Sequence, residues 1–180
     1  MSEIKFQRIF LVGYMGVGKT TIGRLLAKKM DLEFIDLDKV IESKYYKTIS
    51  ELFTEKGEEE FRKIEQSYLH EVSQFENVVI STGGGTPCFL DNMNFMNQMG
   101  KTIYIQASVE ELTSRIKNSK NIRPILKNQQ PENLENFIEN HLQQRIKFYQ
   151  KASIIIDTQK ISGNNKIHQI VDLICEIVNE

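Results

Sequence analysis

A glycine-rich stretch from Gly13 to Thr20 constrains the fold of this chain more than any other part of the sequence. It reads GYMGVGKT and fits the pattern G-x-x-x-x-G-K-[ST] in full, directly after the apolar run RIFLV and directly before a stretch with helical spacing. Glycines let backbone N–H groups approach phosphate oxygens closely, and the start of a helix adds partial positive charge. Lys19 can then reach the β- and γ-phosphates of a nucleoside triphosphate, and the Thr20 hydroxyl can ligate Mg²⁺. The pattern therefore predicts a strand, a phosphate-binding loop and a helix.

Short β-rich runs alternate with longer amphipathic stretches along the chain. Three of the runs are nearly continuous in apolar residues, as expected for strands buried on both faces of a parallel sheet. The expected fold is therefore an α/β three-layer sandwich with a doubly wound parallel sheet, in one domain over residues 1–180. The expected strands are Arg8–Val12, Glu33–Asp38, Val78–Thr82, Thr102–Ala107 and Ser153–Asp157.

Composition excludes several classes of protein. The net charge of −1 provides no basic field for nucleic acid or an anionic membrane. No apolar run approaches the roughly 18–20 residues that span a bilayer, and MSEIKFQR lacks the apolar core of a signal peptide. Cys88 and Cys175 are the only cysteines, and the three histidines lack the spacing of metal ligands. We therefore expect a cytoplasmic protein that binds neither nucleic acid nor membrane.

Two aspartates mark the end of the second expected strand. Asp36 and Asp38 are two residues apart in FIDLD, and they point to the same side if the strand continues through both. At the carboxyl end of a parallel strand, one carboxylate can serve Mg²⁺ and the other can accept a hydrogen bond from a substrate hydroxyl. An N-capping pair before the helix KVIESKYY explains these two residues equally well.

Four further features lie where a ligand could meet them. Arg62 lies four residues after Glu58 and three before Glu65, and surface ion pairing would explain such an arginine on its own. The stretch STGGGTP follows the third strand, and its glycines leave backbone N–H groups open to a ligand. Arg145 lies beside the apolar face of its helix, four residues before Tyr149. The polar stretch NSKNIRPILKNQQPEN is long for a connection and predicts a lid or a solvated loop.

Two other functions fit a phosphate-binding loop. A nucleotide switch of the small GTPase type usually carries D-x-x-G and N-K-x-D, and neither occurs here, because NKIH has a histidine where an aspartate would read guanine. ATP is therefore the expected nucleotide. The presence of Lys19, Thr20 and Asp38 argues against a non-catalytic nucleotide-binding module.

Taken in order, the motifs resemble those of shikimate kinases. They are G-x-x-G-x-G-K-[ST], F-x-D-x-D, G-E-x-x-F-R-x-x-E, S-T-G-G-G, R-P-[IL]-L and R-x-x-x-Y, and they span almost the whole chain. The resemblance implies a P-loop kinase fold with a lid and the strand order 2-3-1-4-5. It also implies transfer of the ATP γ-phosphoryl group to the 3-hydroxyl of shikimate, a step toward chorismate and aromatic amino acids. Another small-molecule P-loop kinase, acting on gluconate or a nucleoside monophosphate, is the alternative.

The resemblance also implies a role for each matching residue. Lys19, Asp38 and Arg123 would be catalytic, with Asp38 accepting the proton and Arg123 closing on the phosphates from the lid. Mg²⁺ would be the cofactor, held by Thr20 and, through water, by Asp36 and Ser81. The ATP-binding residues would be Gly16, Val17, Gly18, Lys19, Thr20, Thr21, Arg115 and Arg123, with Arg115 near the adenine. The substrate-binding residues would be Met15, Asp38, Phe53, Arg62, Gly83, Gly84, Gly85 and Arg145, with the two arginines on the shikimate carboxylate.

The same resemblance implies two mobile parts, a substrate-binding segment near residues 33–61 and the lid near residues 118–130. The partners would be shikimate and ATP, and we expect a monomer.

Overall fold

Five parallel strands form a single sheet in the computed structural model, which describes residues 7–118, 133–163 and 165–179. The strand order is β2-β3-β1-β4-β5, and every neighbouring pair is parallel. The strands are β1 (Arg8–Val12), β2 (Glu33–Asp36), β3 (Val78–Ser81), β4 (Lys101–Gln106) and β5 (Ile154–Asp157). Both the expected fold class and the expected strand order are confirmed.

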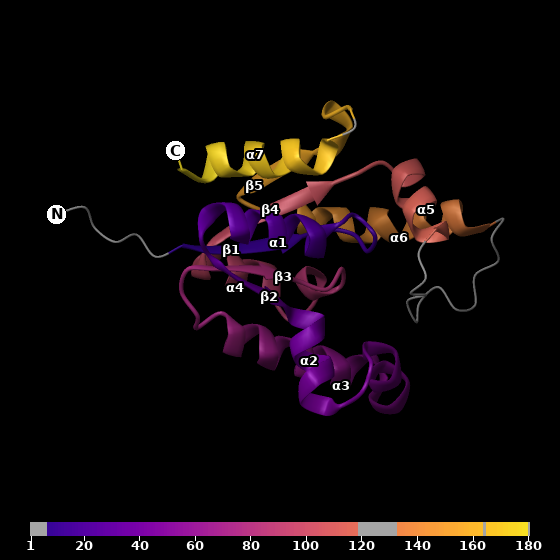
Figure 1. Ribbon diagram of the computed structural model, residues 1–180. Helices are drawn as coiled ribbons and strands as arrows, with labels where there is room; N and C mark the ends of the chain where they lie inside the picture. The colour runs from indigo at the N-terminus through magenta and orange to yellow at the C-terminus, as the bar shows by residue number, and fades with distance from the viewer. Residues whose placement is uncertain (1–6, 119–132, 164, 180) are drawn as a thin grey trace.

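Helices connect the strands and cover both faces of the sheet (Figure 1). The α-helices are α1 (Lys19–Met30), α2 (Leu37–Tyr45), α3 (Ile49–Val72), α4 (Asn92–Met99), α5 (Val109–Lys117), α6 (Leu134–Tyr149) and α7 (Lys166–Asn179). Two short 3-10 helices, η1 (Thr86–Cys88) and η4 (Thr158–Lys160), follow β3 and β5.

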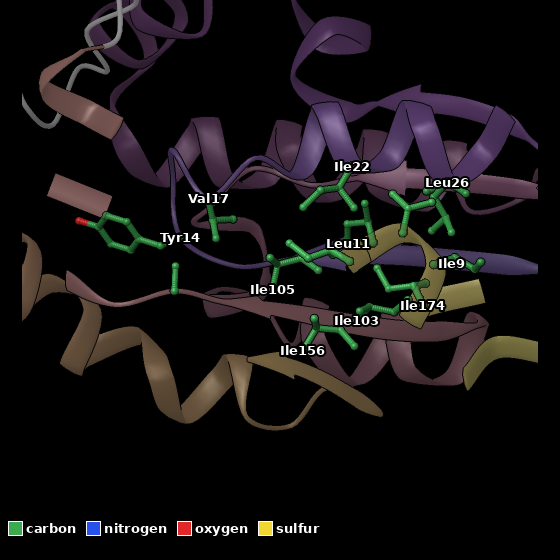
Figure 2. Packing of buried hydrophobic residues seen from close by; sticks show 14 of the residues in the cluster. Ile9, Leu11, Tyr14, Val17, Ile22, Leu26, Ile103, Ile105, Ile156 and Ile174 are labelled. Carbon is green, nitrogen blue, oxygen red and sulfur yellow. The ribbon is translucent and has the colours of Figure 1, made fainter. Parts of the chain in front are cut away.

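Alternate residues of β1 separate the core into two layers. Ile9 and Leu11 pack into a cluster with α1 and α7, and Figure 2 shows Ile9 and Leu11 beside Ile22 and Leu26 of α1. Phe10 and Val12 face the other way, into a cluster with α2, α3 and α4. Because successive strand residues point to opposite faces, the buried run from Ile9 to Val12 needs a helical layer on each side.

The second strand is shorter than the sequence indicated. β2 ends at Asp36, whose Oδ1 accepts a hydrogen bond from the backbone N–H of Lys39 at 3.3 Å and so caps α2. Asp38 therefore lies in the first turn of α2, and the expectation that Asp36 and Asp38 share a strand face is wrong. The capping alternative holds for Asp36, because its carboxylate satisfies an N–H group that the helix leaves open.

Helix α3 is interrupted in its first half. Thr48 and Glu51 form a capping box at its start, with both reciprocal hydrogen bonds present. Gly57 has φ 76° and ψ 169°, which is a left-handed, extended backbone that divides α3 into two helices. A side chain at Gly57 would meet no atom within 4 Å, so the positive φ is the reason for glycine there.

Candidate active site

The phosphate-binding loop leaves β1 and ends on α1, at the carboxyl edge of the sheet. Gly16 and Gly18 have φ values of 79° and 101°, and Gly18 is the N-cap of α1. The Lys19 ammonium is buried and donates hydrogen bonds to the carbonyl oxygens of Gly13 at 2.8 Å and Tyr14 at 3.0 Å. The loop therefore holds the ammonium at the start of a helix, where anions bind.

The expected metal-side residues lie together. The Thr20 hydroxyl donates to Asp36 Oδ2 at 2.8 Å. Asp36 and Ser81 are register partners at the ends of the adjacent parallel strands β2 and β3, and Ser81 is buried. Three oxygen-bearing side chains from α1, β2 and β3 thus gather next to the phosphate-binding loop.

Arg62 is buried on α3 among carboxylates and aromatic rings. Its Nη1 donates to Glu65 Oε2 at 2.8 Å, and its Nη2 donates to Glu58 Oε1 at 3.1 Å. Its Cζ lies 4.3 Å from the ring centroid of Phe89 and 5.8 Å from that of Phe53. The Nε of Arg62 is also buried, and no described residue accepts a hydrogen bond from it. The pairing with Glu58 and Glu65 that the sequence suggested does form, but it holds a buried guanidinium instead of a surface one.

The three-glycine stretch lies against this guanidinium. A Cβ atom on Gly85 would lie 2.6 Å from Arg62 Nη2, so only glycine leaves room for the arginine plane. A Cβ atom on Gly83 would lie 2.9 Å from Glu65 Oε1 and 3.1 Å from Asp38 Oδ1. The glycine stretch therefore brings Asp38 of α2 next to the Arg62–Glu65 pair of α3.

The middle glycine joins this region to the phosphate-binding loop. A Cβ atom on Gly84 would lie 3.1 Å from the backbone nitrogen of Met15. The Tyr149 hydroxyl of α6 donates to the Gly84 carbonyl oxygen at 2.6 Å. Gly84 is thus held between the phosphate-binding loop and α6.

Arg145 reaches the same region from α6. It is buried, and its charge acts on Tyr14, His141, Cys88 and Tyr149. Burial raises the pKa of Cys88 to about 11, and the charges of Arg145 and Arg62 oppose this shift. Burial lowers the pKa of His141 to about 4, and the same two guanidinium groups lower it further. Two arginines distant in sequence therefore place positive charge around one small region.

Glu65 is the residue of this site whose importance the sequence analysis missed. Its side chain is almost entirely buried and also accepts a hydrogen bond from the Thr86 hydroxyl at 2.6 Å. Burial raises the pKa of Glu65, while Arg62 and the Thr86 hydrogen bond lower it. Its spacing from Arg62 was visible in the sequence, but its burial depends on the glycine stretch folding over it.

A cavity of about 410 Å³ lies on the other side of the phosphate-binding loop. Arg115 of α5 borders it and donates from Nη1 to the Val17 carbonyl oxygen at 2.6 Å. The lining residues are Gly16, Val17, Gly18, Thr21, Ile22, Ser114, Arg115, Asn118, Ile167 and Ile170. The sequence-predicted ATP residues Gly16, Val17, Gly18, Thr21 and Arg115 all border this cavity.

A second carboxylate that the sequence analysis missed holds Arg115 in place. Glu111 accepts hydrogen bonds from Arg115 Nη2 at 2.6 Å and from Lys166 Nζ at 3.0 Å. It also accepts one from the Thr158 hydroxyl at 3.2 Å. Thr158 and Lys166 are 47 and 55 residues away from Glu111, so no local pattern could have indicated this cluster.

Part of the expected site lies outside the described residues. Arg123 and the expected lid near residues 118–130, apart from Asn118, belong to that part of the chain. Within residues 7–118, 133–163 and 165–179, no group of three or more His, Cys, Asp and Glu side chains could hold a metal ion. No helix in these same ranges is long and apolar enough to cross a membrane.

Comparisons with known proteins agree with one another. The protein-family model for shikimate kinase matches residues 15–175. A shikimate kinase from Parabacteroides distasonis is 52% identical over 172 residues, which are 96% of this chain and 99% of that protein. A crystal structure of shikimate kinase from Bacteroides thetaiotaomicron has a TM-score of 0.91 and 46% identity, covering 97% of this chain and 99% of its own. Shikimate kinase from Acinetobacter baumannii in complex with shikimate has a TM-score of 0.86 and 33% identity, covering 97% and 93%.

Proposed function

The chain belongs to the shikimate kinase family, whose members are ATP-dependent kinases acting on an alcohol group of shikimate, and we propose how its residues carry out this reaction. The γ-phosphoryl group of ATP is transferred to the 3-hydroxyl of shikimate, which gives shikimate 3-phosphate and ADP. One oxygen–phosphorus bond forms to the acceptor as the bond to the leaving ADP oxygen breaks. The acceptor hydroxyl gives up its proton.

The observation that carries this assignment is the pair of buried arginines beside the glycine stretch. Arg62 and Arg145 come from different helices, and both act electrostatically on Cys88 and His141. A guanidinium binds a carboxylate through two parallel hydrogen bonds, and the buried Nε of Arg62 still lacks a partner among the described residues. We assign the two arginines to the carboxylate of shikimate, with the backbone of Gly83–Gly85 and the apolar Met15 and Phe53 around the ring.

The acceptor hydroxyl is assigned to Asp38. Its carboxylate lies at Gly83, next to the Arg62–Glu65 pair, and the adjacent Gly84 lies against the phosphate-binding loop at Met15. From this position Asp38 orients the 3-hydroxyl and accepts its proton. Lys19 stabilises the charge that develops on the transferred phosphoryl group, because an ammonium in a water-poor site acts more strongly than one in water.

The nucleotide is assigned to the loop and the 410 Å³ cavity. Backbone N–H groups of Gly16–Thr21 would bind the phosphates, and Arg115, which borders the cavity, would lie beside the base. Mg²⁺ commonly uses one or two carboxylates together with phosphates and water, which fits Thr20, Asp36 and Ser81. Thr20 would hold the ion directly and the other two through water, and the ion would supply neutralisation of the phosphate charge. Arg123 stays a sequence-based prediction for the phosphates, and so does the lid.

Two broader assignments follow from the same reasoning. We propose one kinase domain over residues 1–180, in which the segment near 33–61 moves when substrate binds. We also propose a cytoplasmic monomer, since the free thiols of Cys88 and Cys175 suit a reducing compartment. The molar mass measured by light scattering during size-exclusion chromatography would test whether the protein is a monomer.

A coupled assay for ADP release tests the function directly. We expect ADP formation with ATP and shikimate, and negligible formation with gluconate or AMP in place of shikimate. Turnover with gluconate or AMP but not with shikimate would support the alternative small-molecule kinase. ATP binding without turnover on any of the three would support a non-catalytic module.

A further inference from the structure

Helix α6 presents one row of polar side chains toward the phosphate-binding loop and the glycine stretch. His141, Arg145 and Tyr149 are spaced four residues apart, so they lie on one helical face. Tyr149 binds the Gly84 carbonyl, as described above. His141 forms a second contact, because its Nδ1 lies 2.8 Å from the hydroxyl oxygen of Tyr14. One helix therefore holds both loops of the site by tyrosine hydrogen bonds.

Tyr14 links α6 to the phosphate-binding loop, because it belongs to the loop and its hydroxyl meets His141 of α6. Its side chain is buried in the core, where Figure 2 shows it next to Val17. Its ring meets the His141 ring edge-on, with 5.5 Å between the centroids and 79° between the planes. The carbonyl oxygens of Gly13 and Tyr14 both accept hydrogen bonds from Lys19 Nζ. The side chain of Tyr14 thus fixes the peptide units that hold the ammonium.

We propose that Tyr14 and His141 form a positioning pair, which anchors the first half of the phosphate-binding loop to α6 and so sets the place of the Lys19 ammonium. The pair rests on the proposed function, because Lys19 acts on the phosphates. Neither Tyr14 nor His141 contacts the reacting atoms in this scheme. The anchor lies one helical turn from Arg145, so the phosphate-binding lysine and the substrate-binding arginine share one rigid support.

Both members of the pair are neutral around pH 7. Burial raises the pKa of the Tyr14 hydroxyl to about 12, although Arg145 opposes this. Burial and the two arginine charges lower the pKa of His141 to about 4. A single O–H or N–H proton therefore joins them, whichever tautomer the imidazole adopts. A neutral hydrogen bond of this kind changes an equilibrium by about three- to tenfold.

The test compares variants that remove the hydrogen bond from either side. Tyr14→Phe deletes only the hydroxyl, and His141→Leu deletes the ring nitrogens. His141→Asn puts an amide near the position of Nδ1 and serves as the conservative replacement. Tyr68→Phe is the matched control, because Tyr68 is a half-buried tyrosine of α3 whose ring meets Tyr45.

We expect Tyr14→Phe and His141→Leu each to lower kcat by about three- to tenfold, with the KM for shikimate changed less than about twofold. The double variant should lose no more than the worse single variant, because both remove the same contact. His141→Asn should recover part of the loss, and Tyr68→Phe should match the wild type. An unchanged kcat in Tyr14→Phe, losses that multiply in the double variant, or an equal loss in the control would overturn the proposal.

A binding measurement separates this proposal from the assigned reaction. Calorimetry with ADP and with the β,γ-imido analogue of ATP reports on the loop without any turnover. Tyr14→Phe should weaken the imido analogue about three- to tenfold and ADP less, because the ammonium serves the γ-phosphate as well as the β-phosphate. If wild type fails to phosphorylate shikimate, the assigned reaction is wrong, while this ratio still decides the role of the pair. An unchanged ratio of the two affinities would count against the pair.

Discussion

Replacing Arg62 with lysine should separate shikimate binding from ATP binding. Lysine keeps the positive charge but loses the planar fork that grips a carboxylate. In the structure the fork already uses Nη1 for Glu65 and Nη2 for Glu58, and its Nε is buried next to the glycine stretch. A lysine ammonium at the end of a flexible chain can satisfy Glu65 or the substrate, but it cannot hold both in one plane.

The size of the effect follows from the number of charged hydrogen bonds lost. A hydrogen bond to a charged group contributes about 1.5–3 kcal/mol. If Arg62→Lys removes one such bond to the substrate, the dissociation constant of shikimate rises by about 10- to 100-fold. ATP affinity should change little, because the phosphates belong to the loop around Lys19. Arg145→Lys should give the same split between the two ligands.

The assay is a titration of each protein with both ligands, followed by the analogue of shikimate that carries an amide in place of its carboxylate. Wild type should bind the amide much more weakly than shikimate, and each variant should discriminate less. Lys63→Met is the matched control, because Lys63 is a neighbouring cation of α3 that pairs with Glu59 at 2.9 Å and faces solvent. Thermal unfolding of each variant confirms that the titrated protein is folded.

Two results would refute the carboxylate assignment. Equal affinity of wild type for the amide analogue and for shikimate would remove the reason for two arginines in this region. Equal weakening of ATP and shikimate in Arg62→Lys would mean that Arg62 supports the fold of the whole site instead of one ligand.

Three further outcomes follow from the same site. Lys19→Met should leave the protein folded and lower kcat by at least about 10²-fold, and near-normal turnover in a folded variant would contradict the role of the loop. Asp38→Asn should lower kcat by about 10²–10⁴-fold, and if Asp36→Asn lost activity while Asp38→Asn did not, the two roles would be reversed. Folding lowers the pKa of His141 from 6.5 to about 4, so the unfolded chain binds a proton more readily than the folded protein between these pH values. The free energy of unfolding is therefore higher above pH 6.5 and falls as pH drops toward 4. The advantage of wild type over His141→Gln in thermal unfolding should therefore shrink from pH 7 to pH 4.5, and a constant difference would contradict the shift.

Local patterns were sufficient for the sheet and for the phosphate-binding loop. Apolar runs located all five strands to within a few residues. The central strands β1, β3 and β4 are buried on both faces along most of their length, which leaves few other compositions open to them. The glycines of the phosphate-binding loop could also be interpreted from the sequence, since the positive φ at Gly16 and Gly18 leaves little choice of residue. The end of β2 was not, because Asp36 can extend a strand or cap a helix, and the cap prevailed.

Contacts between distant segments could not be read from the sequence. Glu65 looked like one end of a surface ion pair, and only the packing of Gly83 and Gly85 against it reveals a buried carboxylate. Tyr14 and His141 are 127 residues apart, and each alone resembles an ordinary core-edge residue. The geometry around such residues depends on which helix the fold lays beside which loop.

The interruption of α3 at Gly57 has a mechanical consequence. A continuous helix of this length would behave as a stiff rod. Any displacement of its first turns would then be carried to Arg62, which follows Gly57 in the same helix. The non-helical backbone at Gly57 acts as a joint between Ile49–Lys56 and the part that holds Arg62. A Cβ atom at Gly57 would meet nothing within 4 Å, so the backbone there is not enclosed by other atoms, although Ile49 and Leu52 of the preceding turns are buried in the core. The movement proposed for the segment near residues 33–61 would use this joint, with the start of α3 moving together with α2 while the guanidinium of Arg62 keeps its place against Gly85.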